Sequence, residues 1–338
     1  MYIDFAEVQS VTVTEMIYER ERQTLSPFAF LSENTKGRDE PINPCCLRGD
    51  FQRDRDRIIH SKAFRRLMHK TQVFLSPEAD HYRTRLTHTL EVSQVARSIA
   101  RALSLNEDLC EAVALGHDLG HTPFGHAGER VLRKCYDPDF AHYRQSIRVV
   151  EKLEKLNLTW EVRDGILHHT TGGAETLEGR LILEADHIAY INHDIDDAFR
   201  GGILTPDDIP QELFDRLGHS HGERINTMVT SIIRASEGRP EIKMEPDVRE
   251  MTDKLHAFLY EKVYRSPIAK GEEGKAEVLL ECLFDYFVTH PDKLPAEYHQ
   301  TVEEESAGRA VCDYISCMTD RYAVSLYRKL FIPDPWRG

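Results

Sequence analysis

The most constraining feature of the chain lies between Gly116 and Glu129. This short stretch holds three histidines, an aspartate and a glutamate, together with glycines and a proline that end a helix and turn the chain. So many metal-ligand and acid–base side chains in one turn indicate a site rather than a core. The adjacent His117 and Asp118 offer an imidazole nitrogen beside a carboxylate oxygen, a mixed set that suits a divalent metal. Two ligands cannot hold a metal alone, so the fold has to bring others to this turn.

The composition is that of a globular protein. The chain has 338 residues, of which 41% are hydrophobic and 30% charged, and no apolar run approaches the roughly 20 residues needed to cross a bilayer. The N-terminus lacks a signal-peptide pattern, so we expect a cytoplasmic protein with no membrane partner. The seven cysteines form no CxxC pair, which predicts reduced thiols rather than a disulfide framework. A formal net charge of −14 disfavours broad non-specific nucleic-acid binding.

Apolar residues recur at helical spacing along the chain, and no strand-like alternation of useful length appears. We therefore predict an all-α fold. It comprises an N-terminal arm (1–47), a helical core that carries the site (48–200), and a C-terminal helical region packed on that core (201–338). Helices in the last region are expected over 225–233, 248–263, 276–287 and 310–330.

Two further ligands are predicted from helical patterns. Positions 88, 92, 95, 99 and 103 follow one helix face, which places His88 on an inward stripe. The next helix should begin at Asn106, a good N-cap, and run antiparallel to the first, so that His88 can face His117. In a later helix Asp186 lies beside an apolar stripe, where a carboxylate needs a hydrogen bond, an ion pair or a metal. His88, His117, Asp118 and Asp186 are the predicted metal ligands.

Two other clusters are interpreted differently. Between Arg48 and Lys70, eight basic residues outnumber three acidic ones. They form either a helix face with internal salt bridges or, taken together with a metal site, a polyphosphate cradle, which we favour. His168 and His169 end a predicted helix before two glycines. We interpret this pair as a helix C-terminus, where imidazole suits the negative end of the helix dipole, rather than as metal ligands.

Several strings of sequence resemble a known family. They span 51–67, 81–88, 117–129, 188–198 and 318–323. The order His88, His117-Asp118, Asp186 is similar to the metal site of the HD superfamily of phosphohydrolases. The longer strings resemble the deoxyguanosinetriphosphate triphosphohydrolase-like branch over nearly the whole chain. This resemblance implies an HD-domain helical bundle with additional C-terminal helices. It also implies hydrolysis of a deoxynucleoside triphosphate between the α-phosphorus and the 5′ oxygen, which releases a deoxynucleoside and tripolyphosphate.

The resemblance implies roles for individual residues. The four predicted ligands hold one divalent metal ion, with Mn²⁺ or Mg²⁺ first and Fe²⁺, Co²⁺ or Ni²⁺ also open, since ligand type does not choose among them. The remaining matches are a catalytic pair in which the carboxylate orients the imidazole (His126 and Glu129), residues that contact the phosphates (His121 and His142), and positions that bind base, phosphate or sugar (Gln72, Arg85, Tyr190 and Asp194). Two positions depart from the family pattern: His187, usually a basic residue and often Arg, and Tyr143, usually Asn.

Two alternatives stay open at this point. One is an HD-type phosphohydrolase of a cyclic or signalling nucleotide, which would release pyrophosphate or orthophosphate instead of tripolyphosphate. The other is a nucleic-acid-binding regulatory HD protein with a vestigial site. The resemblance further implies a deoxynucleoside triphosphate substrate and a homo-oligomer (hexamer or tetramer). We also consider a second nucleotide or single-stranded DNA as effector, with the basic stretch 48–70 as the surface for the DNA.

Overall fold

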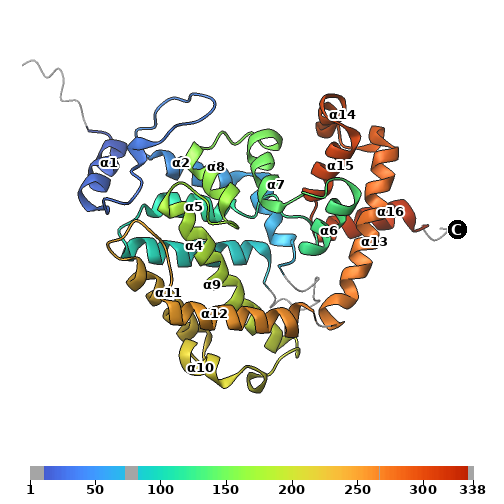
Figure 1. The fold of residues 1–338 in the computed structure, drawn as a ribbon. Helices are drawn as coiled ribbons and strands as arrows, with labels where there is room; N and C mark the ends of the chain where they lie inside the picture. The colour runs from blue at the N-terminus through green and yellow to red at the C-terminus, as the bar shows by residue number, and fades with distance from the viewer. Residues whose placement is uncertain (1–10, 73–82, 266, 334–338) are drawn as a thin grey trace, which may run out of the picture.

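The computed structural model of the chain describes residues 11–72, 83–265 and 267–333. Within these residues it has α-helices and no β-strand, apart from one isolated bridge between Thr71 and Thr84 (Figure 1). The predicted all-α fold is confirmed. The helices are α1 (Val13–Thr24), α2 (Asp50–His60), α3 (Lys62–Arg66), α4 (Arg85–Ala102), α5 (Glu107–Gly116), α6 (His126–Cys135), α7 (His142–Arg148), α8 (Trp160–His168), α9 (Leu177–Arg200), α10 (Gln211–Leu217), α11 (His221–Ser236), α12 (Pro246–Leu259), α13 (Pro267–Thr289), α14 (His299–Glu304), α15 (Ala307–Ser316) and α16 (Asp320–Phe331).

Local capping explains where the central helices begin. Asn106 accepts hydrogen bonds from the backbone N–H groups of Asp108 and Leu109, so α5 starts where the sequence predicts. Thr84 caps α4 in the same way by accepting from Thr87. The two helices pack against each other, and α9 packs on both. This arrangement brings the inner face of α4 to the end of α5, where the His-Asp pair lies.

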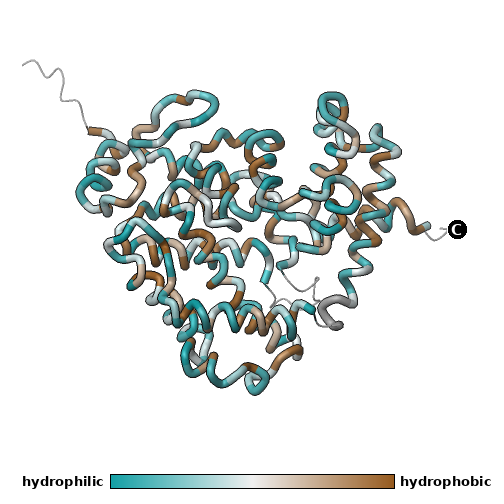
Figure 2. Tube along the Cα trace, in the orientation of Figure 1, coloured by the Kyte–Doolittle hydropathy of each residue, from teal (hydrophilic) through white to brown (hydrophobic). Residues whose placement is uncertain are grey.

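A large apolar core surrounds these helices. Its fully buried side chains come from α2, α4, α5, α8, α9, α11 and α12; they include Phe51, Ile99, Leu109, Ile166, Ile188 and Met228. Apolar and polar stretches alternate along the same helices, as amphipathic packing requires (Figure 2). Helices α11 and α12 belong to the C-terminal region by sequence, yet they complete the core that carries the site.

A second apolar core lies under α6, α13 and α15 and includes Leu132, Leu280, Phe284 and Val311. Helix α6 comes directly after the His-rich turn, and it packs against α13 on the side of the molecule that carries the C-terminal helices (Figure 1). The turn is therefore held between two cores. The boundary predicted at residue 200 does not coincide with the division between these two apolar cores. Each core contains residues from both sides of that boundary.

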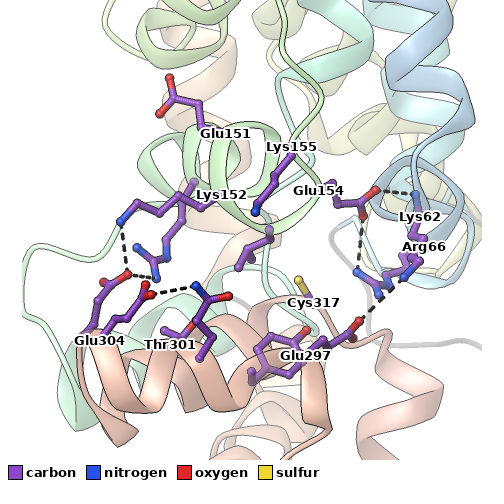
Figure 3. A pocket seen from close by; sticks show the side chains of 15 residues that line it. Lys62, Arg66, Glu151, Lys152, Glu154, Lys155, Glu297, Thr301, Glu304 and Cys317 are labelled. Atoms are coloured by element: carbon purple, nitrogen blue, oxygen red, sulfur yellow. Dashed lines mark hydrogen bonds and ion pairs between the residues drawn. The ribbon is translucent and has the colours of Figure 1, made fainter. Parts of the chain in front are cut away.

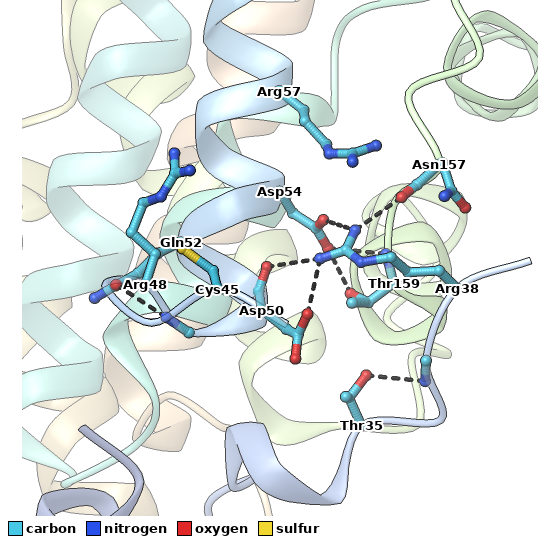
Figure 4. A network of polar contacts seen from close by, with 12 residues as sticks. Thr35, Arg38, Cys45, Arg48, Asp50, Gln52, Asp54, Arg57, Asn157 and Thr159 are labelled. Atoms are coloured by element: carbon cyan, nitrogen blue, oxygen red, sulfur yellow. Dashed lines mark hydrogen bonds and ion pairs between the residues drawn. The ribbon is translucent and has the colours of Figure 1, made fainter. Parts of the chain in front are cut away.

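The N-terminal arm is tied to the core by charge. The Arg38 guanidinium donates to the Asp54 carboxylate of α2 and to the backbone carbonyl of Asn157, 2.7 Å away. The other carboxylate oxygen of Asp54 accepts from the backbone N–H and hydroxyl of Thr159, at 2.8 and 2.6 Å (Figure 4). Thr159 is the residue before α8, so this network fixes the start of the helix whose far end enters the site.

Two predicted helices differ from the structure. The single helix expected over 310–330 is wrong: α15 ends at Ser316 and α16 begins at Asp320. No glycine or proline marks this break; Thr319 caps α16 by accepting from the Tyr322 N–H. The helix expected over 248–263 ends as a π-helical turn, Tyr260–Tyr264. No helix among the described residues is long and apolar enough to cross a membrane.

Candidate active site

A cavity of about 590 Å³ opens where α4, α9 and the His-rich turn meet α12. The predicted site residues gather here: Gln72, Arg85, His88, Asp118, His121, His126, Glu129, His142, Asp186, Tyr190 and Asp194 all line the cavity. The remaining predicted residue, His117, is fully buried next to Asp118. Positions distributed over more than a hundred residues of sequence therefore surround one space.

The predicted metal ligands converge at one end of this cavity. Ring nitrogens of His88 and His117 and a carboxylate oxygen of Asp118 lie within 4.8 Å of one another. Asp186 is adjacent, with its Oδ1 3.0 Å from Nε2 of His88. His117 donates from Nδ1 to the carbonyl of Ala114 at 2.6 Å, which leaves its Nε2 buried without a hydrogen-bond partner.

These groups fit a divalent cation. A buried imidazole nitrogen without a partner is costly unless it binds something, and here it lies 3.6 Å from a carboxylate oxygen of Asp118. Burial alone raises the pKa of Asp118, but the charges of His117 and Arg85 outweigh it and hold that pKa well below the usual range. Burial likewise raises the pKa of Asp186, and the hydrogen bond from His88 more than reverses the effect. Both carboxylates are therefore ionised at neutral pH, as metal ligands must be.

His193 is a residue of this site that the sequence reasoning missed. It is fully buried, and its Nε2 lies 2.9 Å from Nδ1 of His88. This contact orients the His88 ring so that Nε2 faces Asp186. The helical spacing of the sequence could have identified it, because positions 186 and 193 are two turns apart on α9 and therefore lie on one face of the helix.

The turn after α5 projects the other histidines into the cavity. A side chain at Gly120 would lie 2.1 Å from the backbone nitrogen of Ser146, so only glycine lets α7 approach the turn this closely. Phe124 and Gly125 both have positive φ, 59° and 58°, which tightens the turn just before α6. The ring of His121 stacks on His142, with centroids 4.6 Å apart.

The imidazoles of His121 and His126 are uncharged at neutral pH. Desolvation, reinforced by the nearby Arg85 guanidinium, lowers the pKa of His121 well below its usual value. The ring of His126 is partly open to the cavity, yet the surrounding protein and Arg85 lower its pKa to about 4. The cavity thus presents the neutral rings of His121 and His126 beside the fixed positive charge of Arg85.

Glu129 has a different partner from the one the resemblance implies. Among the described residues no hydrogen bond joins it to His126. Its Oε1 accepts from the backbone N–H of His142 at 3.0 Å and lies 3.4 Å from the ring Nδ1 of the same residue. The reason is local: His142 is the first residue of α7, where backbone N–H groups have no helical acceptor and attract a carboxylate. Burial raises the pKa of Glu129, but the bonds to His142 lower it to about 2.

The His168-His169 pair does lie at the C-terminus of α8, as interpreted, but the two rings have different surroundings. Helix α8 does end at His168, whose Nδ1 lies 2.9 Å from the Asp164 carboxylate. His169, however, is buried, and its ring centroid lies 5.0 Å from that of His117. Its Nε2 is 3.2 Å from Nε2 of His142. A helix-end pattern alone does not show which of two adjacent rings faces inward.

The far end of the cavity is formed partly by the C-terminal region. Tyr264 donates its hydroxyl hydrogen to the Asp194 carboxylate. Tyr190 contacts His256 edge-on, with ring centroids 5.6 Å apart. Neither Tyr264 nor His256 was identified from the sequence, because its pattern gives no position for the helices beyond residue 200 relative to the site.

The basic stretch from Arg48 to Lys70 does not line this cavity, so the prediction of a polyphosphate cradle is wrong here. Most of its basic side chains bond to carboxylates or to backbone carbonyls, and two of them, Lys62 and Arg66, border a separate cavity of about 410 Å³. There Lys62 lies 3.8 Å from Glu297, and Arg66 lies 3.8 Å from Glu154 (Figure 3). Lys70 is buried and donates to the backbone carbonyls of His121 and Ser316.

Comparisons with known proteins decide the family. A protein of Caldanaerobacter subterraneus subsp. tengcongensis named deoxyguanosinetriphosphate triphosphohydrolase-like protein is 58% identical, with 96% of this chain and 97% of that protein aligned. A protein of the same name from Desulfatibacillum aliphaticivorans is 49% identical over 96% of this chain and 99% of its own. This chain belongs to the deoxyguanosinetriphosphate triphosphohydrolase-like family. A crystal structure of a hypothetical protein from Aquifex aeolicus matches with a TM-score of 0.48 and 20% identity over 83% of this chain and 68% of its own, too weakly to bear on function.

Two family domains map onto the described fold. Residues 85–191 match the HD domain, and residues 242–329 match a domain described as phosphohydrolase-associated. In this chain the HD domain contains every predicted metal ligand. The associated domain contributes His256 and Tyr264 to the other end of the cavity. The site is therefore built from both.

Proposed function

We propose that this protein hydrolyses deoxynucleoside triphosphates to a deoxynucleoside and tripolyphosphate, using one divalent metal ion. The observation that carries the proposal is the gathering of eleven predicted site residues around a single cavity, next to a His-His-Asp group able to hold a metal. The names of the relatives agree with this substrate class.

The ligands of the ion in this proposal are His88, His117, Asp118 and Asp186. Such an ion, Mn²⁺ or Mg²⁺ first, supplies positive charge that polarises a phosphoryl oxygen. Arg85 adds a fixed charge within the cavity, since its guanidinium lies 2.7 Å from Asp118 and lines the same space. An arginine in this position pairs well with phosphate oxygens.

In this proposal a neutral histidine of the cavity transfers the proton to the leaving group. A triphosphate brings about four negative charges into the cavity, and nearby negative charge raises the pKa of an imidazole. His126, whose pKa is about 4 without a bound anion, then takes up a proton only when substrate is bound. Water attacks the α-phosphorus and loses a proton to solvent while the bond to the 5′ oxygen breaks. The imidazolium donates its proton to this departing oxygen, a step worth about 10²- to 10⁴-fold.

The other end of the cavity selects the sugar. Asp194 is held by the Tyr264 hydroxyl, and Tyr190 presents its ring beside it. We propose that Asp194 accepts from the 3′-hydroxyl while the Tyr190 ring covers the sugar face, where a 2′-hydroxyl would crowd the contact. Deoxyribose is then favoured over ribose.

The test is a panel of the four dNTPs and GTP, singly and in mixtures, with Mn²⁺ or Mg²⁺ and with EDTA. Products are separated by chromatography. We expect a deoxynucleoside and tripolyphosphate, with activity lost in EDTA and in His117→Gln. No release from any dNTP or mixture would refute the proposal, and pyrophosphate would favour the alternative HD-type phosphohydrolase. Mixtures also test the predicted effector nucleotide, and light scattering tests the predicted hexamer or tetramer.

A further inference from the structure

Lys70 is a buried, charged side chain that the proposed reaction does not use. It lies between α3 and α4 and is only 2% exposed. Its Nζ donates to the backbone carbonyl of His121 and, at 2.7 Å, to that of Ser316. Both acceptors are uncharged oxygens. Burying an ammonium against uncharged acceptors costs free energy, which a methionine of similar length would not.

Lys70 joins three parts of the fold. Its side chain links the His-rich turn to the end of α15, and its backbone carbonyl accepts from the N–H of Arg85, the first residue of α4, at 3.1 Å. The nearby Asp320 accepts from the Phe124 N–H at 2.9 Å. A cation therefore holds the carbonyl of His121, and an anion holds the N–H three residues later. Opposite charges hold the two ends of one turn.

The direction of the His121 ring depends on its backbone. Its Nδ1 is buried, and no group among the described residues hydrogen-bonds to it. The ring stacks on His142 with centroids 4.6 Å apart, a contact without a directional hydrogen bond. The His121 N–H donates to the carbonyl of Asp118 at 3.1 Å, and the His121 carbonyl accepts from Lys70. Because the peptide group is planar, holding this oxygen fixes the peptide plane and, with it, the direction of the side chain.

We propose that Lys70 is a positioning residue of this site: its buried ammonium holds the His121 ring where the phosphates bind. The inference deepens the proposed function and rests on it, since His121 is expected to contact the phosphates of that substrate. Lys70 acts through His121 and does not line the cavity itself. A side chain without a donor at this position would leave two buried carbonyls unsatisfied and free the turn to move. A shift of about 1 Å at a reacting group costs on the order of 10²-fold in rate.

The ammonium is charged at neutral pH and loses its proton a little above it. Burial lowers the pKa of Lys70 from 10.5 to about 8. Charged and titratable groups face it from four elements: Arg66 of α3 and Arg85 of α4 lower this pKa further, whereas Cys317 after α15 and Asp320 of α16 raise it. Above pH 8 the nitrogen becomes a neutral amine, whose hydrogen bonds are about half as strong as those of an ammonium. We therefore expect kcat to fall about three- to tenfold as the pH rises through 8.

The same titration changes stability in the opposite direction. A lysine in the unfolded chain has a pKa of about 10.4, so between about pH 8 and 10.4 the unfolded chain binds more protons than the folded one. The free energy of unfolding therefore rises with pH in this interval, while kcat falls. A residue that only stabilised the fold would change activity and stability together. Opposite trends with pH distinguish a positioning role from a structural one.

The experiment compares Lys70→Met and Lys70→Arg with Lys62→Met, a control at a lysine whose side chain is 64% exposed and outside the active-site cavity. For each full-length protein, kcat for a dNTP and the urea midpoint are measured from about pH 6.5 to 9.5. In the wild type and Lys62→Met we expect kcat to fall and the urea midpoint to rise across pH 8. Lys70→Met should lose about tenfold or more in kcat at pH 7, together with both trends. Lys70→Arg keeps its charge at every pH tested, so its kcat should stay level.

A folded Lys70→Met protein with kcat within twofold of the wild type at pH 7 would overturn the inference while leaving the proposed function intact. A wild-type urea midpoint that falls together with kcat would also overturn it. If the wild type hydrolyses no dNTP, the proposed function fails, and a crystal structure of Lys70→Met decides the positioning alone: a displaced His121 ring supports it, and an unmoved ring opposes it. Should Lys70→Met fail to fold, Lys70→Arg decides: level kcat through pH 8 supports the inference, and the wild-type decline opposes it.

Discussion

Replacing Asp320 by alanine tests whether the C-terminal region positions the His-rich turn. Asp320 is the first residue of α16 and is buried. One carboxylate oxygen accepts from the backbone N–H of Phe124 at 2.9 Å. The other accepts from the N–H of Thr71 at 2.8 Å and from its hydroxyl. The carboxylate thus clamps the turn that carries His121 and His126 to the segment leading into Gln72.

The expected effect follows from these three bonds. Removing the carboxylate leaves the buried Phe124 N–H without its acceptor, which costs about 1–3 kcal/mol, and loses charge-assisted bonds to Thr71. We expect Asp320→Ala to lower the free energy of unfolding by about 3 kcal/mol. Phe124 holds a positive φ, a conformation that the rest of the structure has to stabilise. Without the clamp the turn relaxes, and a displacement of about 1 Å at His121 or His126 costs on the order of 10²-fold in rate.

The assay combines urea unfolding with dNTP hydrolysis at saturating substrate. The control is Thr319→Ala, which removes the N-cap of the same helix and costs about 1 kcal/mol without touching the turn. Asp320→Asn keeps one acceptor oxygen and is expected to recover part of the rate. A folded Asp320→Ala protein with kcat within twofold of the wild type would refute the positioning argument, as would an equal loss in Thr319→Ala.

Three further outcomes are expected. His193→Ala removes the contact that orients the His88 ring and should weaken metal affinity about 10- to 100-fold, as measured by calorimetry. Unchanged affinity would contradict this role of His193. Burial raises the pKa of Glu178 to about 7, above its value in the unfolded chain. The free energy of unfolding should therefore be highest below about pH 4.5, where the carboxyl is protonated in both states, and should fall by about 3 kcal/mol as the pH rises to 7. Urea unfolding of Glu178→Gln should lack this slope, and parallel profiles would contradict the assignment. Tyr264→Phe removes the donor to Asp194 and should reduce dGTP-over-GTP discrimination about three- to tenfold, measured by kcat/KM; full retention would exclude the tyrosine from sugar selection.

The parts that were predictable from sequence depend on local chemistry. The cap at Asn106 and the apolar spacing after His88 determine where α5 starts and which face of α4 is buried, and both follow from a few neighbouring residues. The ligand-type residues of the turn were recognisable because histidine and aspartate are rare in so tight a segment. Such signals place side chains on a face or at a helix end.

The parts that were missed depend on which elements meet. Glu129 bonds to His142 because the start of α7 happens to lie against α6, and no pattern in either helix encodes that meeting. His169 enters the site because α8 is anchored at its other end by Asp54 and Arg38. The break between α15 and α16 contains no glycine or proline that would mark it in the sequence. Its consequence is the contact of Asp320 with the distant Phe124.

The two family domains contribute different kinds of residue to the site. This difference explains why the identities of the site residues could be predicted better than their arrangement in space. The HD domain supplies the groups that we propose bind metal and transfer protons, and these residue types are conspicuous in sequence. The associated domain supplies Asp320 and the Ser316 carbonyl that holds Lys70, which in turn donates to the carbonyl of His121. An ordinary aspartate and a backbone oxygen carry no sequence signal, yet they set the position of the turn on which the histidines sit. The proposed metal ligands and proton-transfer residues can therefore all lie in one domain and still depend, for their alignment, on contacts made by the other.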